Sequence, residues 1–263
     1  MFFKKILKRI KSFPLRLSIK SRQKKYKGRL SYLFYDNSSD SIIIVFSGFT
    51  GKTPKYNYVK SLGSLPIDRL YILDDFGYMG SYYWFENGEE TPRRLTEDLI
   101  NNILSKNYKH VFFAGSSKGG TCSIFYGLQY NAELIFSGAC QFNVGSYLHR
   151  KDHENIFYGM MGKHAGEEEA CILNSMMPKQ FEKYAGSSSL IHLVYSKNEL
   201  TYQRQIIDLL QKGHKCNLQI IEHLEDFSNH EDIGVVFPSW VIKLLVEHDS
   251  ICKSSYKHHH SLC

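Results

Sequence analysis

The sequence lacks the cysteine spacings that mark zinc sites and disulfide frameworks. Its six cysteines are scattered without a single C-x-x-C pair, at Cys122, Cys140, Cys171, Cys216, Cys252 and Cys263. This scatter predicts neither a zinc site nor a set of structural disulfides. Isolated thiols are typical of a reducing compartment, so we expect a cytoplasmic protein with no bound metal.

Long apolar runs and early acidic residues are missing too. No stretch is long enough to cross a bilayer, and lysines interrupt the apolar residues near the N-terminus, so we expect neither a transmembrane helix nor a secretory signal. The first acidic residue is Asp36, whereas 12 of the 33 Lys and Arg residues lie within residues 1–29. The other 21 are outnumbered by 26 acidic residues, so the net charge of +7 reflects the N-terminal segment alone. We therefore expect no nucleic-acid partner.

Residues 1–29 form a basic tail with an amphipathic pattern. Its apolar residues share one helical face opposite the lysines, at Phe3, Ile6, Leu7, Ile10 and Phe13. This pattern is typical of a helix that lies on an anionic membrane surface. The alternatives are an arm that docks on an acidic partner and an arm that is merely solvated. We expect a protein that is peripheral on the inner face of the cell membrane, or bound to a partner there.

The remaining chain predicts one α/β domain at residues 30–250, followed by a tail at 251–263, because no internal repeat or low-complexity linker divides it. In the tail, His258-His259-His260 is a conceivable metal site, but we favour a disordered end. Pro92 fits the first turn of a helix, with Thr91 as its cap. Apolar patterns predict strands at 30–35, 41–48, 70–73, 110–114, 134–139, 189–195 and 216–222, and helices at 56–62, 92–106, 119–130, 201–213 and 233–247.

The sequence Gly115-Ser116-Ser117-Lys118-Gly119 follows an apolar run and precedes a helical pattern. It matches G-x-S-x-G, the nucleophile elbow of α/β-hydrolases. A serine at such a turn is held in a strained backbone conformation with its hydroxyl clear of the sheet, and glycines let the neighbouring backbone approach. Ser117 is therefore the candidate nucleophile. The alternative is an ordinary turn between a strand and a helix.

The β-branched run at residues 41–48 is apolar on both faces, which indicates a central strand of a mostly parallel sheet with helices on both sides. It leads into the loop Gly48-Phe49-Thr50-Gly51, at a strand end where ligands gather. In the hydrolase fold this loop and the residue after the serine supply the oxyanion-hole amides. We assign these roles to the N–H groups of Phe49 and Lys118.

A catalytic triad is predicted from chain order. Nucleophile, acid and histidine follow one another along α/β-hydrolases, and here Ser117, Glu199 and His230 each follow a predicted strand. The histidine would carry the proton of the serine, and the acid would orient the imidazole. Asn198 and Asp226 remain alternatives to Glu199 as the acid.

Two segments are candidates for ligand contact. The stretch from Asp74 to Trp84 is dense in aromatics, glycine and acids, so we expect Tyr82 and Tyr83, with Gly48, to bind substrate. Buried core aromatics are the alternative interpretation. Residues 141–188 are the least regular part of the sequence and predict a lid insertion. They hold three histidines, without a metal motif and with no metal expected, at His149, His153 and His164.

The elbow with Lys118 after the serine resembles that of bacterial capsular polysaccharide O-acetyltransferases with an α/β-hydrolase fold. The Lys55-Tyr56-Asn57-Tyr58-Val59-Lys60 stretch is also similar, as is the Ser/His layout over residues 30–245. The resemblance extends to other polysaccharide-locus proteins with a hydrolase-like core. It implies transfer of an acetyl group from acetyl-CoA, through an acetyl-serine, to a hydroxyl of a surface polysaccharide. Capsule-assembly proteins then become candidate partners of residues 1–29.

Two other functions stay open at this point. An esterase or deacetylase would use the same triad with water as the acceptor. An inactive hydrolase-like subunit of a polysaccharide assembly or export complex would depend on the basic tail rather than on Ser117.

Overall fold

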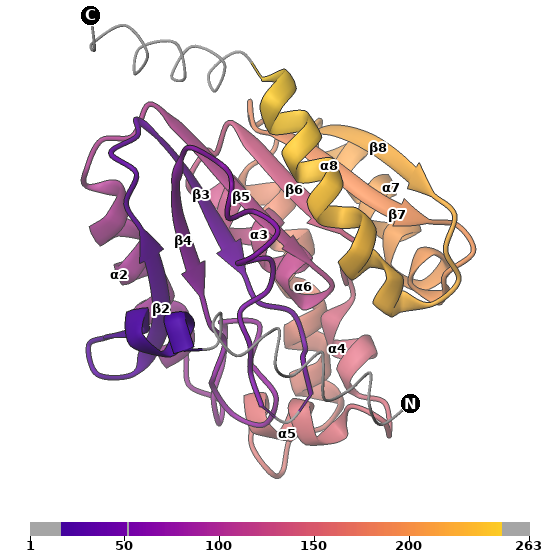
Figure 1. Cartoon of the computed structure of the whole chain (residues 1–263). Helices are drawn as coiled ribbons and strands as arrows, with labels where there is room; N and C mark the ends of the chain where they lie inside the picture. The colour runs from indigo at the N-terminus through magenta and orange to yellow at the C-terminus, as the bar shows by residue number, and fades with distance from the viewer. Residues whose placement is uncertain (1–16, 52, 249–263) are drawn as a thin grey trace, which may run out of the picture.

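The computed structural model describes residues 17–248 apart from residue 52 (Figure 1). The predicted amphipathic stretch at residues 3–13 lies outside these residues. The tail at 251–263, with its three consecutive histidines, lies outside them as well. Within the described residues, no helix combines the length and the apolar character needed to cross a membrane.

An eight-stranded sheet forms the centre of the domain, in the order β1-β2-β4-β3-β5-β6-β7-β8. The β1–β2 and β2–β4 pairs are antiparallel and all other pairs are parallel. The strands are β1 (Lys24–Tyr26), β2 (Leu30–Tyr35), β3 (Ser41–Phe46), β4 (Asp68–Ile72), β5 (His110–Ser116), β6 (Leu134–Gly138), β7 (Leu190–Ser196) and β8 (Gln219–Glu225). The mostly parallel sheet confirms the predicted fold class.

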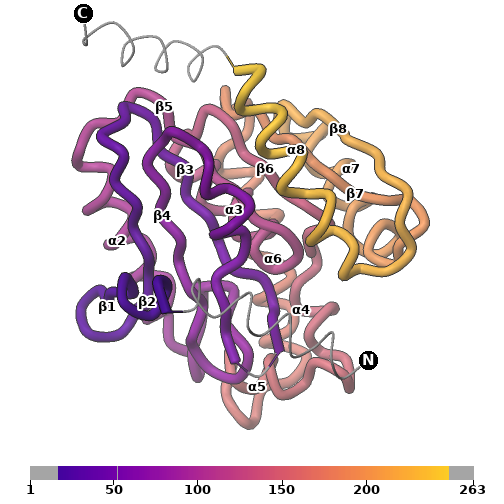
Figure 2. The backbone as a smooth tube through the Cα atoms, viewed as in Figure 1, coloured from indigo at the N-terminus to yellow at the C-terminus, as the bar shows by residue number. Residues whose placement is uncertain are grey.

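One edge of the sheet corrects a predicted boundary. Lys24 pairs with Tyr32 and Tyr26 with Leu30, so β1 adds a short strand beside β2 (Figure 2). The folded domain therefore begins before residue 30, and residues 1–29 are not a tail throughout. The run of lysines gave no indication of a strand in the sequence, because an edge strand can expose lysine side chains to solvent without cost.

Helices cover both faces of the sheet. In β3, Ile42 and Ile44 belong to the apolar cluster under α2, α3, α6 and α7, while Ile43 and Val45 belong to the cluster under α8 (Figure 1). This alternation explains why the strand is apolar at every position. The helices are α2 (Thr91–Leu104), α3 (Lys118–Gln129), α4 (Val144–Leu148), α5 (Glu154–Met161), α6 (Glu167–Lys183), a π-helical turn η1 (Tyr202–Ile206), α7 (Ile207–Lys215), a 3-10 turn η2 (His230–Asp232) and α8 (Ile233–Glu247).

Two local predictions were wrong. Residues 56–62 form turns rather than a helix. The N-cap of α2 is Glu90, with Thr91 as the first helical residue, although Pro92 does lie in the first turn. The predicted insertion at residues 141–188 is largely helical (α4, α5 and α6), and Phe157, Leu173 and their apolar neighbours are buried against the main core.

Candidate active site

The turn between β5 and α3 holds Ser117 in a conformation that few non-glycine residues adopt. Its φ is 53° and its ψ is −128°, which places it in the left-handed half of backbone space. Gly115 and Gly119, which flank the turn, allow the close backbone packing that this conformation needs. A Cβ on Gly115 would lie 2.2 Å from the carbonyl oxygen of Gly119, and a Cβ on Gly119 would lie 2.6 Å from that of Phe46. The strained turn and the close backbone contacts fit the predicted elbow.

The three predicted triad side chains lie in hydrogen-bonding contact. His230 Nε2 is 2.8 Å from Ser117 Oγ, and His230 Nδ1 is 3.0 Å from Glu199 Oε1. Ser117 follows β5, Glu199 follows β7, and His230 begins η2 after β8. The carboxyl ends of parallel strands share one edge of a sheet, so residues far apart in sequence meet there.

The structure distinguishes among the three candidates for the third triad position, Glu199, Asn198 and Asp226. Asn198 Nδ2 donates to Asp226 Oδ1 at 2.8 Å, so these two side chains bind each other. Neither of them is hydrogen-bonded to His230, whose Nδ1 partners are Glu199 and, at 3.2 Å, the hydroxyl of Thr201. Glu199 is thus the acid positioned to orient the imidazole.

Glu199 is 5% exposed, and its surroundings favour the ionised form. Burial opposes ionisation, but the hydrogen bonds from His230 and from the Thr201 hydroxyl outweigh it and hold the pKa of the carboxyl below its usual value. The backbone N–H of Thr201 also donates to Oε1, at 3.2 Å. The sequence analysis missed Thr201. Its position two residues after an acid at the start of a helical segment was the available signal.

Gln141 is a second residue that the sequence analysis missed. It is fully buried, and its Nε2 donates to Ser117 Oγ at 3.3 Å. Tyr82 in turn donates from its hydroxyl to Gln141 Oε1 at 3.1 Å. Gln141 follows β6, so the only sequence signal was its place just after a strand that neighbours the elbow strand.

The predicted substrate contacts of Tyr82 and Tyr83 are wrong. Both side chains are 0% exposed, so neither ring offers a face to a ligand. The Tyr83 hydroxyl donates to the carbonyl oxygen of Ile72 at 2.8 Å and also lies 2.9 Å from the backbone N and the Oγ of Ser47. These tyrosines support the site from within the core, the alternative that composition alone left open.

The Tyr-Asn-Tyr stretch anchors the loop after β3 and the elbow. Asn57 Oδ1 accepts a hydrogen bond from the N–H of Gly48 at 3.0 Å. The Tyr58 hydroxyl lies 2.5 Å from Ser116 Oγ, next to the nucleophile. Burial raises the pKa of Tyr58 to about 12, so its hydroxyl stays protonated at neutral pH.

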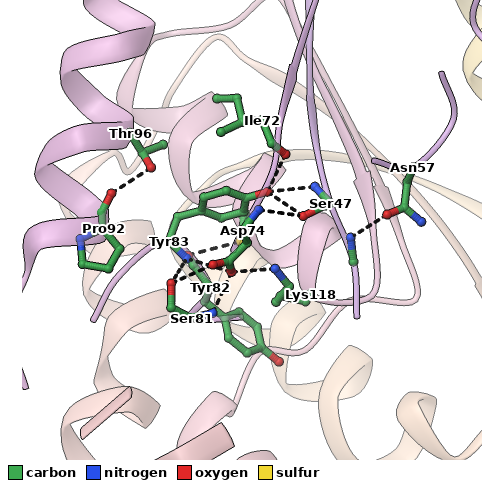
Figure 3. A network of polar contacts seen from close by, with 12 residues as sticks. Ser47, Asn57, Ile72, Asp74, Ser81, Tyr82, Tyr83, Pro92, Thr96 and Lys118 are labelled. Atoms are coloured by element: carbon green, nitrogen blue, oxygen red, sulfur yellow. Dashed lines mark hydrogen bonds and ion pairs between the residues drawn. The ribbon is translucent and has the colours of Figure 1, made fainter. Parts of the chain in front are cut away.

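Lys118 is tied into a buried polar network (Figure 3). Its Nζ lies 2.6 Å from Asp74 Oδ2, and both side chains are fully buried. Asp74 also accepts hydrogen bonds from Ser81 N and Ser81 Oγ, while its own N–H donates to Ser47 Oγ at 3.0 Å. The network therefore joins the residue after the nucleophile to the residue before the Gly48 loop.

The N–H groups of Phe49 and Lys118 remain candidates for an oxyanion hole. Neither donates a hydrogen bond to another described residue. Phe49 and Gly48 line a cavity of about 550 Å³ together with Ser117 and His230. Free amide donors beside a serine hydroxyl provide the kind of site that stabilises a developing negative charge.

A second cavity, of about 420 Å³, lies beside the first. The two share Tyr147, His153 and His230, but the second borders Glu199 rather than Ser117. Residues of the α4–α5 segment thus line both cavities. Within the described part of the chain, no three His, Cys, Asp or Glu side chains are grouped to hold a metal ion.

Comparisons with known proteins agree on the fold. No protein-family model matches the chain, and no curated protein does. The capsule O-acetyltransferase of Neisseria meningitidis serogroup A is a similar solved structure, with a TM-score of 0.73 and 20% identity over 86% of this chain and 94% of that chain. A histidine-to-alanine mutant of that enzyme, in complex with CoA, gives a TM-score of 0.70 and 20% identity over 84% and 93%.

Two further solved structures are similar. The glycosylation-associated Gap123 complex of Streptococcus agalactiae gives a TM-score of 0.68 and 19% identity over 88% of this chain and 47% of that chain. The serine hydrolase FphF of Staphylococcus aureus gives 0.56 and 9% over 81% and 90%. At these identities the likeness establishes the fold. The sheet order, the strained serine turn and these neighbours together show that the chain has the α/β-hydrolase fold.

Proposed function

We propose that the protein is a serine acyltransferase that moves an acetyl group from acetyl-CoA to a hydroxyl of a bacterial surface polysaccharide. The carrying observation is the continuous hydrogen-bonded chain from Ser117 through His230 to Glu199. The similarity to a capsule O-acetyltransferase that binds CoA supports the choice of donor and acceptor.

In the first half-reaction, His230 Nε2 takes the proton of Ser117 as Oγ attacks the thioester carbonyl. The C–S bond then breaks, and the thiol leaves with the proton that the imidazole carried. In the second half-reaction, the acceptor hydroxyl gives its proton to His230 and attacks the acetyl-serine. The proton finally returns to Ser117 Oγ as the ester bond to the enzyme breaks.

Charge develops at two places during these steps. The carbonyl oxygen becomes an oxyanion, which the N–H groups of Phe49 and Lys118 would stabilise. Losing one such donor typically costs roughly 3–4 kcal/mol of barrier. The imidazole becomes positive, and the ionised Glu199 at 3.0 Å stabilises it and fixes its tautomer.

An esterase with the same triad is the second candidate. The His230 side chain is 33% exposed, so water can reach the acyl-serine. Similar structures such as FphF are serine hydrolases. An inactive subunit has no need of an assembled triad, so we do not propose that role.

The basic N-terminal segment supports a separate proposal about location. Residues 1–16 carry six of the twelve N-terminal cations and precede the described fold. We propose that they bind an anionic membrane surface on the cytoplasmic side or a protein of the polysaccharide assembly machinery. A neighbour that belongs to a glycosylation-associated complex supports the second partner. Deleting residues 1–16, which spares β1, should release the protein from membranes.

The direct test is incubation with acetyl-CoA and a candidate polysaccharide, followed by mass spectrometry of the polymer. We expect acetylated polymer with the wild type and none with Ser117→Ala. A fluorophosphonate probe should label Ser117. Acetyl-CoA hydrolysis at a rate independent of added acceptor would favour the esterase.

A further inference from the structure

The 420 Å³ cavity beside the triad is lined by two arginines. Arg150 follows α4, and Arg204 lies within η1, so the two come from segments more than fifty residues apart. Both are exposed at the protein surface. The triad members Glu199 and His230 line the same cavity, which places these two positive charges next to the catalytic machinery.

Positive charge exceeds negative charge in the lining of this cavity. Neither guanidinium forms an ion pair or hydrogen bond with a described residue. The carboxylates nearest to them bind other groups, apart from the exposed Asp152, whose charge opposes that of Arg150 at His153. Glu199 binds His230 and Thr201, and Asp208 accepts a hydrogen bond from Asn143 Nδ2 at 2.6 Å. The lining thus holds two guanidinium groups against one carboxylate, that of Glu199, and this excess of positive charge suits an anionic ligand.

The positive charge of Arg150 affects the pKa of the neighbouring His153 side chain. The pKa of His153 is lowered, first by burial and then by the positive charge of Arg150. Arg150 thus lies close to the imidazole that both cavities share. The lowered pKa favours the neutral form of His153.

The position of the cavity limits what its ligand can be. The cavity reaches Glu199 and His230 but not Ser117, which lies in the adjoining 550 Å³ cavity. A ligand held by the arginines must therefore extend past His230 to bring a carbonyl to the serine. A nucleotide thioester has this form, because a long flexible arm separates its phosphates from its acyl group.

We propose that Arg150 and Arg204 bind the phosphate groups of the acyl donor, which leaves the cavity at Ser117 for the acyl group and then the acceptor. This rests on the proposed acetyl transfer from acetyl-CoA. Guanidinium groups bind phosphate oxygens through paired hydrogen bonds. The exposed Leu200, 73% accessible at the same cavity, offers apolar surface to the rest of the donor.

The test compares two donors that differ in phosphate content. Acetyl-CoA carries phosphates, whereas acetyl-pantetheine has the same arm and thioester without them. In Arg150→Gln and Arg204→Gln, we expect the ratio of kcat/KM for acetyl-CoA to that for acetyl-pantetheine to fall roughly tenfold each, since each variant loses charged hydrogen bonds. The matched control is Arg94→Gln, an exposed arginine on α2 that contacts Thr91. It should leave the ratio unchanged.

Several results would overturn the assignment. If the double variant Arg150→Gln/Arg204→Gln leaves the ratio of the two kcat/KM values unchanged, the arginines do not bind the donor, even if acetyl transfer itself proceeds. If the double variant raises only the KM for the polysaccharide, the cavity binds an acidic acceptor instead.

If the wild type does not turn over acetyl-CoA, the proposed function fails. Inhibition of p-nitrophenyl acetate hydrolysis by 3′,5′-ADP then reports nucleotide binding separately. Inhibition in the wild type but not in the double variant supports the phosphate site, and its absence in the wild type refutes it.

Discussion

Lys118 Nζ lies 2.6 Å from Asp74 Oδ2, and neither side chain is exposed to solvent. The pair connects the residue after the nucleophile to the loop after β4. A buried ion pair of this kind is costly to break, because the remaining charge loses its partner without regaining water. Its position suggests that it fixes the backbone of the elbow.

Lys118→Met should destabilise the protein by about 3–5 kcal/mol, since it leaves the Asp74 carboxylate buried and unpaired. Urea denaturation measures this, with Lys60→Met at an exposed position as the control. The double variant Lys118→Met/Asp74→Asn should recover part of the loss. Equal stability of Lys118→Met and Lys60→Met would show that the pair contributes nothing.

Glu199→Gln should lower kcat by about 10³–10⁴-fold, because the amide holds the imidazole in the wrong tautomer. Acetyl-CoA turnover at pH 7.5 is the assay. Asp226→Asn is the matched control, since that carboxylate binds Asn198 rather than His230. A larger loss in Asp226→Asn than in Glu199→Gln would reverse the assignment of the acid.

Asn57→Ala should lower kcat roughly tenfold while KM changes little. Gly48 N–H loses its acceptor at 3.0 Å, so the peptide before Phe49 N–H is held less firmly. An oxyanion hole acts on the transition state and hardly on substrate binding. Asn101→Ala, at an exposed position on α2, is the control. A rise in KM with unchanged kcat would instead place Asn57 in substrate binding.

The lowered pKa of Glu199 predicts a pH-dependent stability. A carboxyl whose pKa is lower in the folded than in the unfolded state stabilises the fold above its unfolded pKa, and this stabilisation is lost as the pH falls through the folded pKa. The difference in unfolding free energy between wild type and Glu199→Gln should therefore be constant from pH 7 to about pH 5 and change only below the ordinary value of 4.5. Urea titrations from pH 7 to pH 3.5 measure it. A difference that already changes between pH 7 and pH 6 would point to another group.

The sequence was sufficient for the features that depend on neighbours along the chain. Glycine spacing identified the elbow at Ser117, and a strand that is apolar at every position indicated a sheet covered on both faces. The order of Ser117, Glu199 and His230 predicted which residues would meet, because parallel strands deliver their following loops to one edge.

Long-range packing decided the rest. The choice of Glu199 over Asp226 depended on a loop thirty residues away, and the burial of Tyr82 and Tyr83 depended on the helices around them. The pairing of β1 with β2 is local, across the turn at residues 27–29, but the run of lysines concealed it. Residue type and periodicity reveal which side chains are apolar or ionisable and which face they share. Which of them end up in contact is set by the free energy of packing segments that the chain keeps far apart.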